Sequence, residues 1–361
     1  MNSTHPLLNR PDNGRLPPFD QALQARLSPV YARLERFIPP MEWAVHAPYI
    51  AAIQEWKRAR NAIILAHNYQ TPEIYYGIAD FTGDSLALAQ KAVQTDAEAI
   101  VMCGVYFMAE TAKMLNMDKT VLIPDSDAGC SLAESITAED VRLLKQRYPG
   151  VPVVAYVNTS VEVKAEVDIC CTSGNAVEVV ESLGSKDVIF LPDQYLGRWV
   201  ASQTDVNMIM WQGSCEVHER FRAEDLRAVR RQYHEVEILA HPECPPSVLE
   251  EADFTGSTAR MIEYVDQRRP SRVVLITECS MSDNVAVEFP DIEFIRPCNL
   301  CPHMKKITLP KVLSCLENLE PAVQISPALA ERARKSVDKM LAISSGPVHI
   351  EDAPFRQRMT G

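Results

Sequence analysis

Neither of the two glycine-rich signatures that often accompany an α/β pattern occurs in this chain. The first, G-x-G-x-x-G, holds the pyrophosphate of a dinucleotide, and the second, G-x-x-x-x-G-K-[ST], cradles the phosphates of a nucleotide. Their absence argues against a nicotinamide-dependent dehydrogenase and against a P-loop kinase.

Long apolar runs are missing as well. No stretch approaches the ~18 consecutive apolar residues that a membrane-spanning helix needs. The first ten residues, M-N-S-T-H-P-L-L-N-R, also lack the basic start and apolar core of a secretory signal peptide. We therefore expect a cytoplasmic protein with no membrane partner.

The chain has fewer basic than acidic residues. Lys and Arg total 36 while Asp and Glu total 48, so the formal net charge is -12. Proteins that bind nucleic acid neutralise its phosphates with clustered Lys and Arg, and this surface has the opposite sign. We expect no nucleic-acid partner, and any anionic substrate must be held by local groups.

The ten cysteines lack the regular spacing of a disulfide framework. Without an export signal, such thiols are typical of metal sites or catalytic groups in a reducing compartment. Cys298 and Cys301 have C-x-x-C spacing, but no second C-x-x-C completes a zinc knuckle. Four other cysteines are expected to be buried as small apolar side chains, namely Cys170, Cys171, Cys279 and Cys315.

Three distant thiols lie in loops beyond segments that are predicted to be buried. Cys103 lies in V-M-C-G-V, Cys215 in W-Q-G-S-C-E-V-H and Cys301 in C-P-H-M. Cysteine thiolates are the usual ligands of zinc and of iron-sulfur clusters. These three loops therefore predict one shared metal centre.

A pattern of strand, turn, helix and strand occurs three times along the chain. If Ser85, Ser173 and Thr258 mark equivalent helix starts, the copies are spaced by 88 and 85 residues. Equal spacing of such units predicts internal pseudo-symmetry. We expect an α/β protein with three pseudo-symmetric three-layer α/β domains around a central active-site cavity.

The repeat also predicts where the units begin and end. At roughly 100–200 residues per domain, a chain of this length holds two or three compact units. Two packing helices are expected before the first unit, at Phe19–Ile38 and Trp43–Arg60. The predicted segments are an N-terminal extension with packing helices at 1–60, α/β domains at 61–150, 151–233 and 234–325, and a C-terminal helix and tail at 326–361.

Polar side chains follow the first strand of each copy. They are His67 and Tyr69, then Tyr156 and Asn158, then His241 and Glu243. Ligands of parallel α/β sheets bind beyond the carboxyl ends of the strands, and helix N-termini with free amides attract anions. We expect these groups to meet in one anion-binding cavity, with His218 and Glu243 suited to proton transfer beside a metal.

The chain resembles the quinolinate synthase (NadA) family over about residues 40–320. The resemblance rests on many motifs in one order: H-N-Y-Q at 67–70, G-D-S at 83–85, C-G-V-Y-F-M-A-E-T-A-K at 103–113, P-D-S-D-A-G-C-S-L-A at 124–133, A-Y-V-N at 155–158, T-S-G-N-A at 172–176, W-Q-G-S-C-E-V-H at 211–218, H-P-E-C at 241–244, G-S-T at 256–258 and C-P-H-M at 301–304.

The resemblance implies a reaction and a cofactor. Members of the family condense iminosuccinate with dihydroxyacetone phosphate to quinolinate, with loss of phosphate and water, in NAD biosynthesis. They use a 4Fe-4S cluster as a Lewis acid, held by three cysteines so that one iron stays open. By motif, the resemblance places these ligands at Cys103, Cys215 and Cys301. A partner that oxidises aspartate, an L-aspartate oxidase or dehydrogenase, is implied as the source of iminosuccinate.

The resemblance also implies roles for the polar residues. The residues expected to bind the substrates are His67, Ser85, Tyr156, Asn158, Ser173, His241, Glu243 and Thr258. The residues expected to take part in catalysis are Glu243 as the base, with His241, Tyr69, His218 and Tyr156.

The chain departs from the family at one place and leaves one ligand in dispute. Some members carry C-x-x-C-x-x-C ending at the last ligand, but Ile295 fills the first position here, which argues against a redox role for Cys298. The repeat itself favours another first ligand, because Cys130 follows His67 by 63 residues, much as Cys301 follows His241 by 60. The motif around Cys103 is longer, and it decides the expectation.

Two other functions fit the same residues. One is a zinc-dependent hydrolase or lyase that uses Cys298, Cys301 and nearby histidines. The other is an iron-sulfur scaffold protein without catalytic activity. Metal content separates the first from the cluster enzyme, and substrate turnover separates the second.

Overall fold

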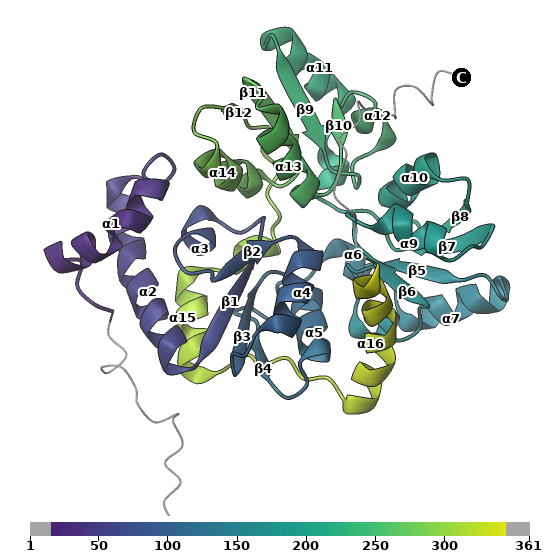
Figure 1. Cartoon of the computed structure of the whole chain (residues 1–361), viewed down its shortest axis with the longest axis horizontal. Helices are drawn as coiled ribbons and strands as arrows, with labels where there is room; N and C mark the ends of the chain where they lie inside the picture. The colour runs from purple at the N-terminus through teal and green to yellow at the C-terminus, as the bar shows by residue number, and fades with distance from the viewer. Residues whose placement is uncertain (1–15, 344–361) are drawn as a thin grey trace, which may run out of the picture.

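Three parallel sheets of four strands form the computed structural model of this chain, which describes residues 16–343. The expectations for the first fifteen residues and for the tail from residue 344 lie outside that range. The first sheet has the order β2-β1-β3-β4, and the other two repeat the order as β6-β5-β7-β8 and β10-β9-β11-β12. Their identical order confirms the predicted fold class of three α/β units (Figure 1).

The strands are short and largely buried. The first sheet contains β1 (Ala62–His67), β2 (Phe81–Gly83), β3 (Ala99–Cys103) and β4 (Thr120–Leu122). The second contains β5 (Val153–Tyr156), β6 (Ile169–Cys171), β7 (Asp187–Leu191) and β8 (Asn207–Met210). The third contains β9 (Val236–Ala240), β10 (Phe254–Thr255), β11 (Arg272–Ile276) and β12 (Glu293–Ile295). Continuous apolar runs form such strands because helices cover both faces of a parallel sheet.

Helices connect these strands in each unit. Those of the first unit are α3 (Pro72–Tyr75), α4 (Ser85–Gln94), α5 (Tyr106–Leu115), α6 (Ser131–Glu134) and α7 (Ala138–Arg147). Those of the second are α8 (Val161–Lys164), α9 (Ala176–Ser182), α10 (Gln194–Gln203), the 3₁₀ turn η3 (His218–Arg220) and α11 (Ala223–Gln232). Those of the third are α12 (Pro246–Leu249), α13 (Thr258–Arg268), α14 (Cys279–Glu288) and η4 (Met304–Lys306).

The terminal helices close the assembly. The two predicted N-terminal helices are present as α1 (Gln21–Leu34) and α2 (Pro40–Ala59). Helix α15 (Leu309–Asn318) falls in the range predicted for the third unit, yet it packs against α2 and β3 of the first. Helix α16 (Pro327–Ala342) packs against α8 and β6 of the second unit. The end of the described chain therefore ties the first two units together (Figure 1).

Helices begin at Ser85 and Thr258, as the repeat predicts, whereas Ser173 precedes the first residue of α9 by three positions. Asp84 caps α4 by accepting a hydrogen bond from Ala87, and Ser257 caps α13. Ser85 and Thr258 are therefore the first helical residues and not the caps. Because Asp84 does the capping, the Ser85 hydroxyl is not used by the cap, whereas the Thr258 hydroxyl accepts a hydrogen bond from the Asn68 side-chain amide at 2.9 Å.

One disulfide corrects the prediction for Cys279. Cys279 and Cys298 are joined, with their Cα atoms 5.0 Å apart. A β-bridge between Glu278 and Asn299 brings these segments together, and the Cys279 amide donates to the Asn299 carbonyl at 3.2 Å. Cys279 is therefore not a free apolar thiol, because pairing between distant segments decides its state.

Among the helices described between residues 16 and 343, none is long and apolar enough to span a bilayer.

Candidate active site

A central cavity lies where the three units meet, lined by residues from the carboxyl ends of strands in all three sheets. It contains twelve of the thirteen residues that sequence reasoning selected: His67, Tyr69, Ser85, Tyr156, Asn158, Ser173, Cys215, His218, His241, Glu243, Thr258 and Cys301. The pseudo-symmetric strand ends therefore converge, as the repeat predicts.

Cys103 is the selected residue that this cavity does not include. It is the last residue of β3, is fully buried in the core, and lies near Cys315 of α15. Burial raises the pKa of Cys103, and Cys315 raises it further. Cys130, which sequence reasoning set aside, lines the cavity in its place.

Cys130, Cys215 and Cys301 share one local structure. Burial raises the pKa of each thiol, to about 12 for Cys130, while two main-chain amides lower each value. In each case the amides belong to the residues two and three positions further along the chain, namely Leu132 and Ala133, Val217 and His218, and His303 and Met304. The three thiols are equivalent in the pseudo-symmetry, and each has donors that stabilise a thiolate.

The three thiols also influence one another. Cys301 raises the pKa of Cys130, and Cys130 raises the pKa of Cys215, beyond the larger effect of burial. Such effects are stronger between charges that lie near one another in a protein. The three thiols line one cavity and are candidates to hold a metal centre together.

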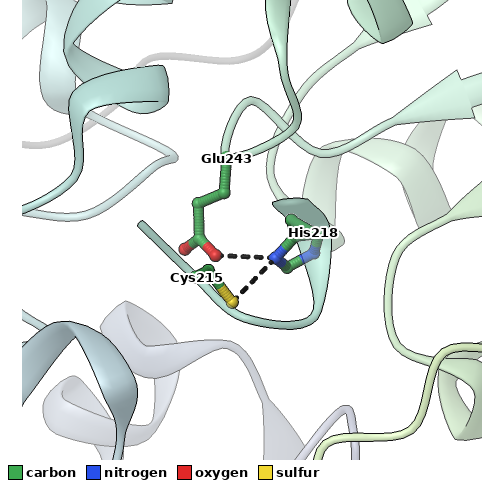
Figure 2. A group of neighbouring side chains, drawn as sticks. All are labelled: Cys215, His218 and Glu243. Carbon is green, nitrogen blue, oxygen red and sulfur yellow. Dashed lines mark hydrogen bonds and ion pairs between the residues drawn. The ribbon is translucent and has the colours of Figure 1, made fainter. Parts of the chain in front are cut away.

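Glu243 lies at the centre of the polar groups. It receives a hydrogen bond from the Tyr156 hydroxyl at 2.5 Å and pairs with Nδ1 of His218 at 2.7 Å. The same Nδ1 lies 3.2 Å from the Cys215 sulfur, as Figure 2 shows. Burial alone raises the pKa of Glu243, but His218, His241 and Tyr156 outweigh burial and hold that pKa well below its usual range. Glu243 is therefore ionised at neutral pH.

Two histidines are neutral at physiological pH. Burial lowers the pKa of His67 to about 4 and that of His241 to about 3, and Glu243 opposes both shifts. The rings of His218 and His241 stack with their centroids 4.7 Å apart. Neutral imidazoles of this kind offer one hydrogen-bond donor and one acceptor to a ligand.

Thr277 is a residue of the site that sequence reasoning missed. Its hydroxyl lies 2.6 Å from the Tyr69 hydroxyl and 3.0 Å from Nε2 of His218. Thr277 follows β11 directly, at the end of a strand other than those that carry the selected polar residues. Its position directly after a predicted strand could have identified Thr277 from the sequence, but no motif marks this threonine.

Unpartnered polar groups remain in the cavity. Among the described residues, Oδ1 of Asn158 and Nδ1 of His303 are buried without a hydrogen-bond partner, and both side chains line the cavity. Buried polar atoms are usually satisfied in a folded protein. The cavity is therefore suited to a polar ligand.

A zinc site that uses Cys298 is not compatible with this structure, because Cys298 is in the disulfide. Cys215, His218 and Glu243 each offer a ligand atom, and these atoms lie within 4.8 Å of one another (Figure 2). A single metal ion fits that group geometrically. It leaves Cys130 and Cys301 without a role.

Comparison with known proteins agrees with the geometry. The family model described as quinolinate synthetase A protein matches residues 51–342. The chain is 64% identical to quinolinate synthase 2 of Mesorhizobium japonicum, over 87% of this chain and 97% of that protein. It is 60% identical to the quinolinate synthase of Agrobacterium fabrum, over 89% of this chain and 93% of that protein. It is 62% identical to a quinolinate synthase of Xylella fastidiosa, over 81% of this chain and 87% of that protein. The chain therefore belongs to the quinolinate synthetase A family.

Proposed function

We propose that this protein condenses iminosuccinate with dihydroxyacetone phosphate to give quinolinate, phosphate and water for NAD biosynthesis. Membership of the family supports this activity. The observation that carries the site assignment is the set of three pseudo-equivalent thiols beside a polar cavity.

We assign the ligands of a 4Fe-4S cluster to Cys130, Cys215 and Cys301. The thiols fit the cluster because each lies in a loop that offers two amide donors, and hydrogen bonds to the sulfurs tune such centres. When bound by three cysteines, the cluster supplies a Lewis-acidic iron to a substrate oxygen. Cys103 is replaced in the ligand set by Cys130.

Proton transfer is assigned to the groups around Glu243. Glu243 is buried and ionised at neutral pH, so it is in the protonation state that a base requires. Tyr156 donates to it and His218 pairs with it, so these two side chains orient the base. Tyr69 and His241 complete the catalytic wall, because both line the same cavity.

Anion binding is assigned to groups on all three units. The hydroxyls of Ser85, Ser173 and Thr258 line the cavity near helix starts, where free amides favour carboxylates and phosphate. His67 and Asn158 lie on the same wall and add polar contacts. Because the chain has a net negative charge, anionic substrates must be bound by local groups of this kind.

The proposal is tested by purification without oxygen. Iron and acid-labile sulfide are measured together with the formation of quinolinate from iminosuccinate and dihydroxyacetone phosphate. Iron and sulfide near four atoms each per chain, with turnover, are expected. Zinc in place of iron supports a single-metal enzyme with the ion at Cys215, His218 and Glu243, and a full cluster without turnover supports the scaffold protein.

The source of iminosuccinate is also a proposal. Because this imine is unstable, we propose that an L-aspartate oxidase or dehydrogenase in the cytoplasm delivers it through a transient contact. Coupled assays test the idea: a transfer that resists a large excess of an unrelated iminosuccinate-consuming reaction supports the contact, and full competition contradicts it.

Replacing Ser173 by alanine is expected to affect binding more than turnover. The hydroxyl contributes to the ground state and the transition state alike, so KM should rise by roughly tenfold at little cost in kcat. Steady-state kinetics with varied dihydroxyacetone phosphate measure both constants. The control is Ser182→Ala, because the Ser182 hydroxyl bonds the Val179 carbonyl within α9 and does not line the cavity. A defect confined to kcat in Ser173→Ala contradicts the assignment.

A further inference from the structure

A charged pair of one fully buried carboxylate and one half-buried ammonium joins the loop of Cys301 to the end of strand β11. The Glu278 side chain is fully buried and caps α14 by accepting the Ser280 amide at 2.8 Å. Its other oxygen accepts the Cys301 amide at 3.3 Å and pairs with the Lys305 ammonium at 2.9 Å. One carboxylate therefore holds the backbone of a proposed cluster ligand and the side chain that follows it.

All three N–H donors of the Lys305 ammonium have acceptors within the protein. Besides Glu278, it donates to the Tyr69 carbonyl at 2.7 Å and to the Ser280 hydroxyl at 2.7 Å. An ammonium has three donors, so none is left for a substrate. The Lys305 amide also donates to the Cys301 carbonyl at 3.2 Å. Lys305 is therefore placed to support its neighbours and not to bind a ligand.

The hydroxyl and the main-chain carbonyl of Tyr69 are both held by contacts that begin at two consecutive residues, Thr277 and Glu278. Thr277 lies 2.6 Å from the Tyr69 hydroxyl, and Glu278 reaches the Tyr69 carbonyl through Lys305. Tyr69 comes from the first unit, while Thr277 and Glu278 come from the third. The pair thus fixes a wall of the cavity across a boundary between units.

We propose that Glu278 and Lys305 are positioning residues that set the proposed cluster ligand Cys301 and the catalytic-wall residue Tyr69 together. The inference rests on the proposed function of the cavity. Supporting residues of this kind hold a metal ligand and its neighbours in the productive geometry, and their loss typically costs about 10–100-fold in metal retention or activity.

A contribution to stability does not by itself explain why the chain has such a charged pair. Removing one partner leaves an uncompensated buried charge and is strongly destabilising, whereas replacing both by neutral groups is often close to neutral. Folding and positioning therefore respond differently to single and double substitutions. This difference provides the test.

The experiment compares Glu278→Gln, Lys305→Met and the double variant with wild type, all purified without oxygen. Melting temperature, iron per chain, the rate of iron release to a chelator, kcat and KM are measured. The single variants should have a lower melting temperature than wild type. They should also release iron about tenfold faster and have a kcat about tenfold lower, with little change in KM. The double variant should regain most of the melting temperature but keep the faster iron release and the lower kcat.

Lys339→Met is the matched control. Lys339 is exposed on α16, where it donates to the Asp168 carbonyl at 2.8 Å, and it does not line the cavity, so its variant should match wild type in every measurement. Recovery of iron retention and kcat along with stability in the double variant would show a purely structural pair and overturn the inference. A wild-type protein without iron would instead overturn the proposed function.

Discussion

Cys130→Ala is expected to lose most of its iron and nearly all quinolinate formation. Cys130 lines the cavity with Cys215 and Cys301, and the amides of the next turn are directed at its sulfur. Loss of a direct ligand should reduce iron retention at least as much as loss of a supporting residue, so we expect more than about tenfold. Iron and sulfide analysis after purification without oxygen checks the prediction.

Cys103→Ala is the matched control for this experiment. Cys103 is fully buried and does not line the cavity, so its substitution should cost about 1 kcal/mol of stability while iron and turnover are retained. Full iron in Cys130→Ala, together with its loss in Cys103→Ala, would reverse the assignment.

Much of the fold was predictable because it depends on local patterns. Short apolar runs predict the buried strands, and the spacing of Ser85, Ser173 and Thr258 predicts three equivalent units. The packing of α15 on α2 was not predictable in this way, since it joins segments far apart in the chain. No periodicity within a helix specifies which distant helix it will contact.

The proposed thiol assignment follows the symmetry of the repeat and not the motif at Cys103. Cys130 follows His67 at nearly the interval that separates Cys301 from His241, and the structure brings Cys130 and Cys301 to one cavity. The long motif at Cys103 reflects a strand end and helix that pack in the core. On the proposed assignment, that motif marks packing beside the cavity, which Val105, Phe107 and Met108 line.

Two other features depend on contacts between distant segments. Thr277 joins Tyr69 to His218, and the bridge from Glu278 to Asn299 brings Cys279 to Cys298. Each is set by how the third unit packs, which composition and spacing do not reveal. Geometry was required to find both.

Glu243→Gln is expected to lower quinolinate formation by roughly 10²-fold or more while the protein keeps its iron. The substitution conserves size but removes the charge that can accept a proton. Glu243 is the buried carboxylate that receives the Tyr156 hydroxyl at 2.5 Å and pairs with His218 at 2.7 Å. Its low pKa keeps wild-type Glu243 ionised throughout the neutral range, so the defect should persist from about pH 6 to pH 8. Turnover and iron content across that range measure the effect.

Glu237→Gln provides the control for the loss of a carboxylate in the same unit. Glu237 lies on β9, hydrogen-bonds Tyr264 and does not line the cavity. Its variant should therefore turn over substrate as wild type does. Loss of iron in Glu243→Gln would indicate that the carboxylate supports the metal centre through His218 and Cys215. Wild-type turnover in Glu243→Gln would remove this residue from the mechanism, since an amide in its place cannot accept the proton.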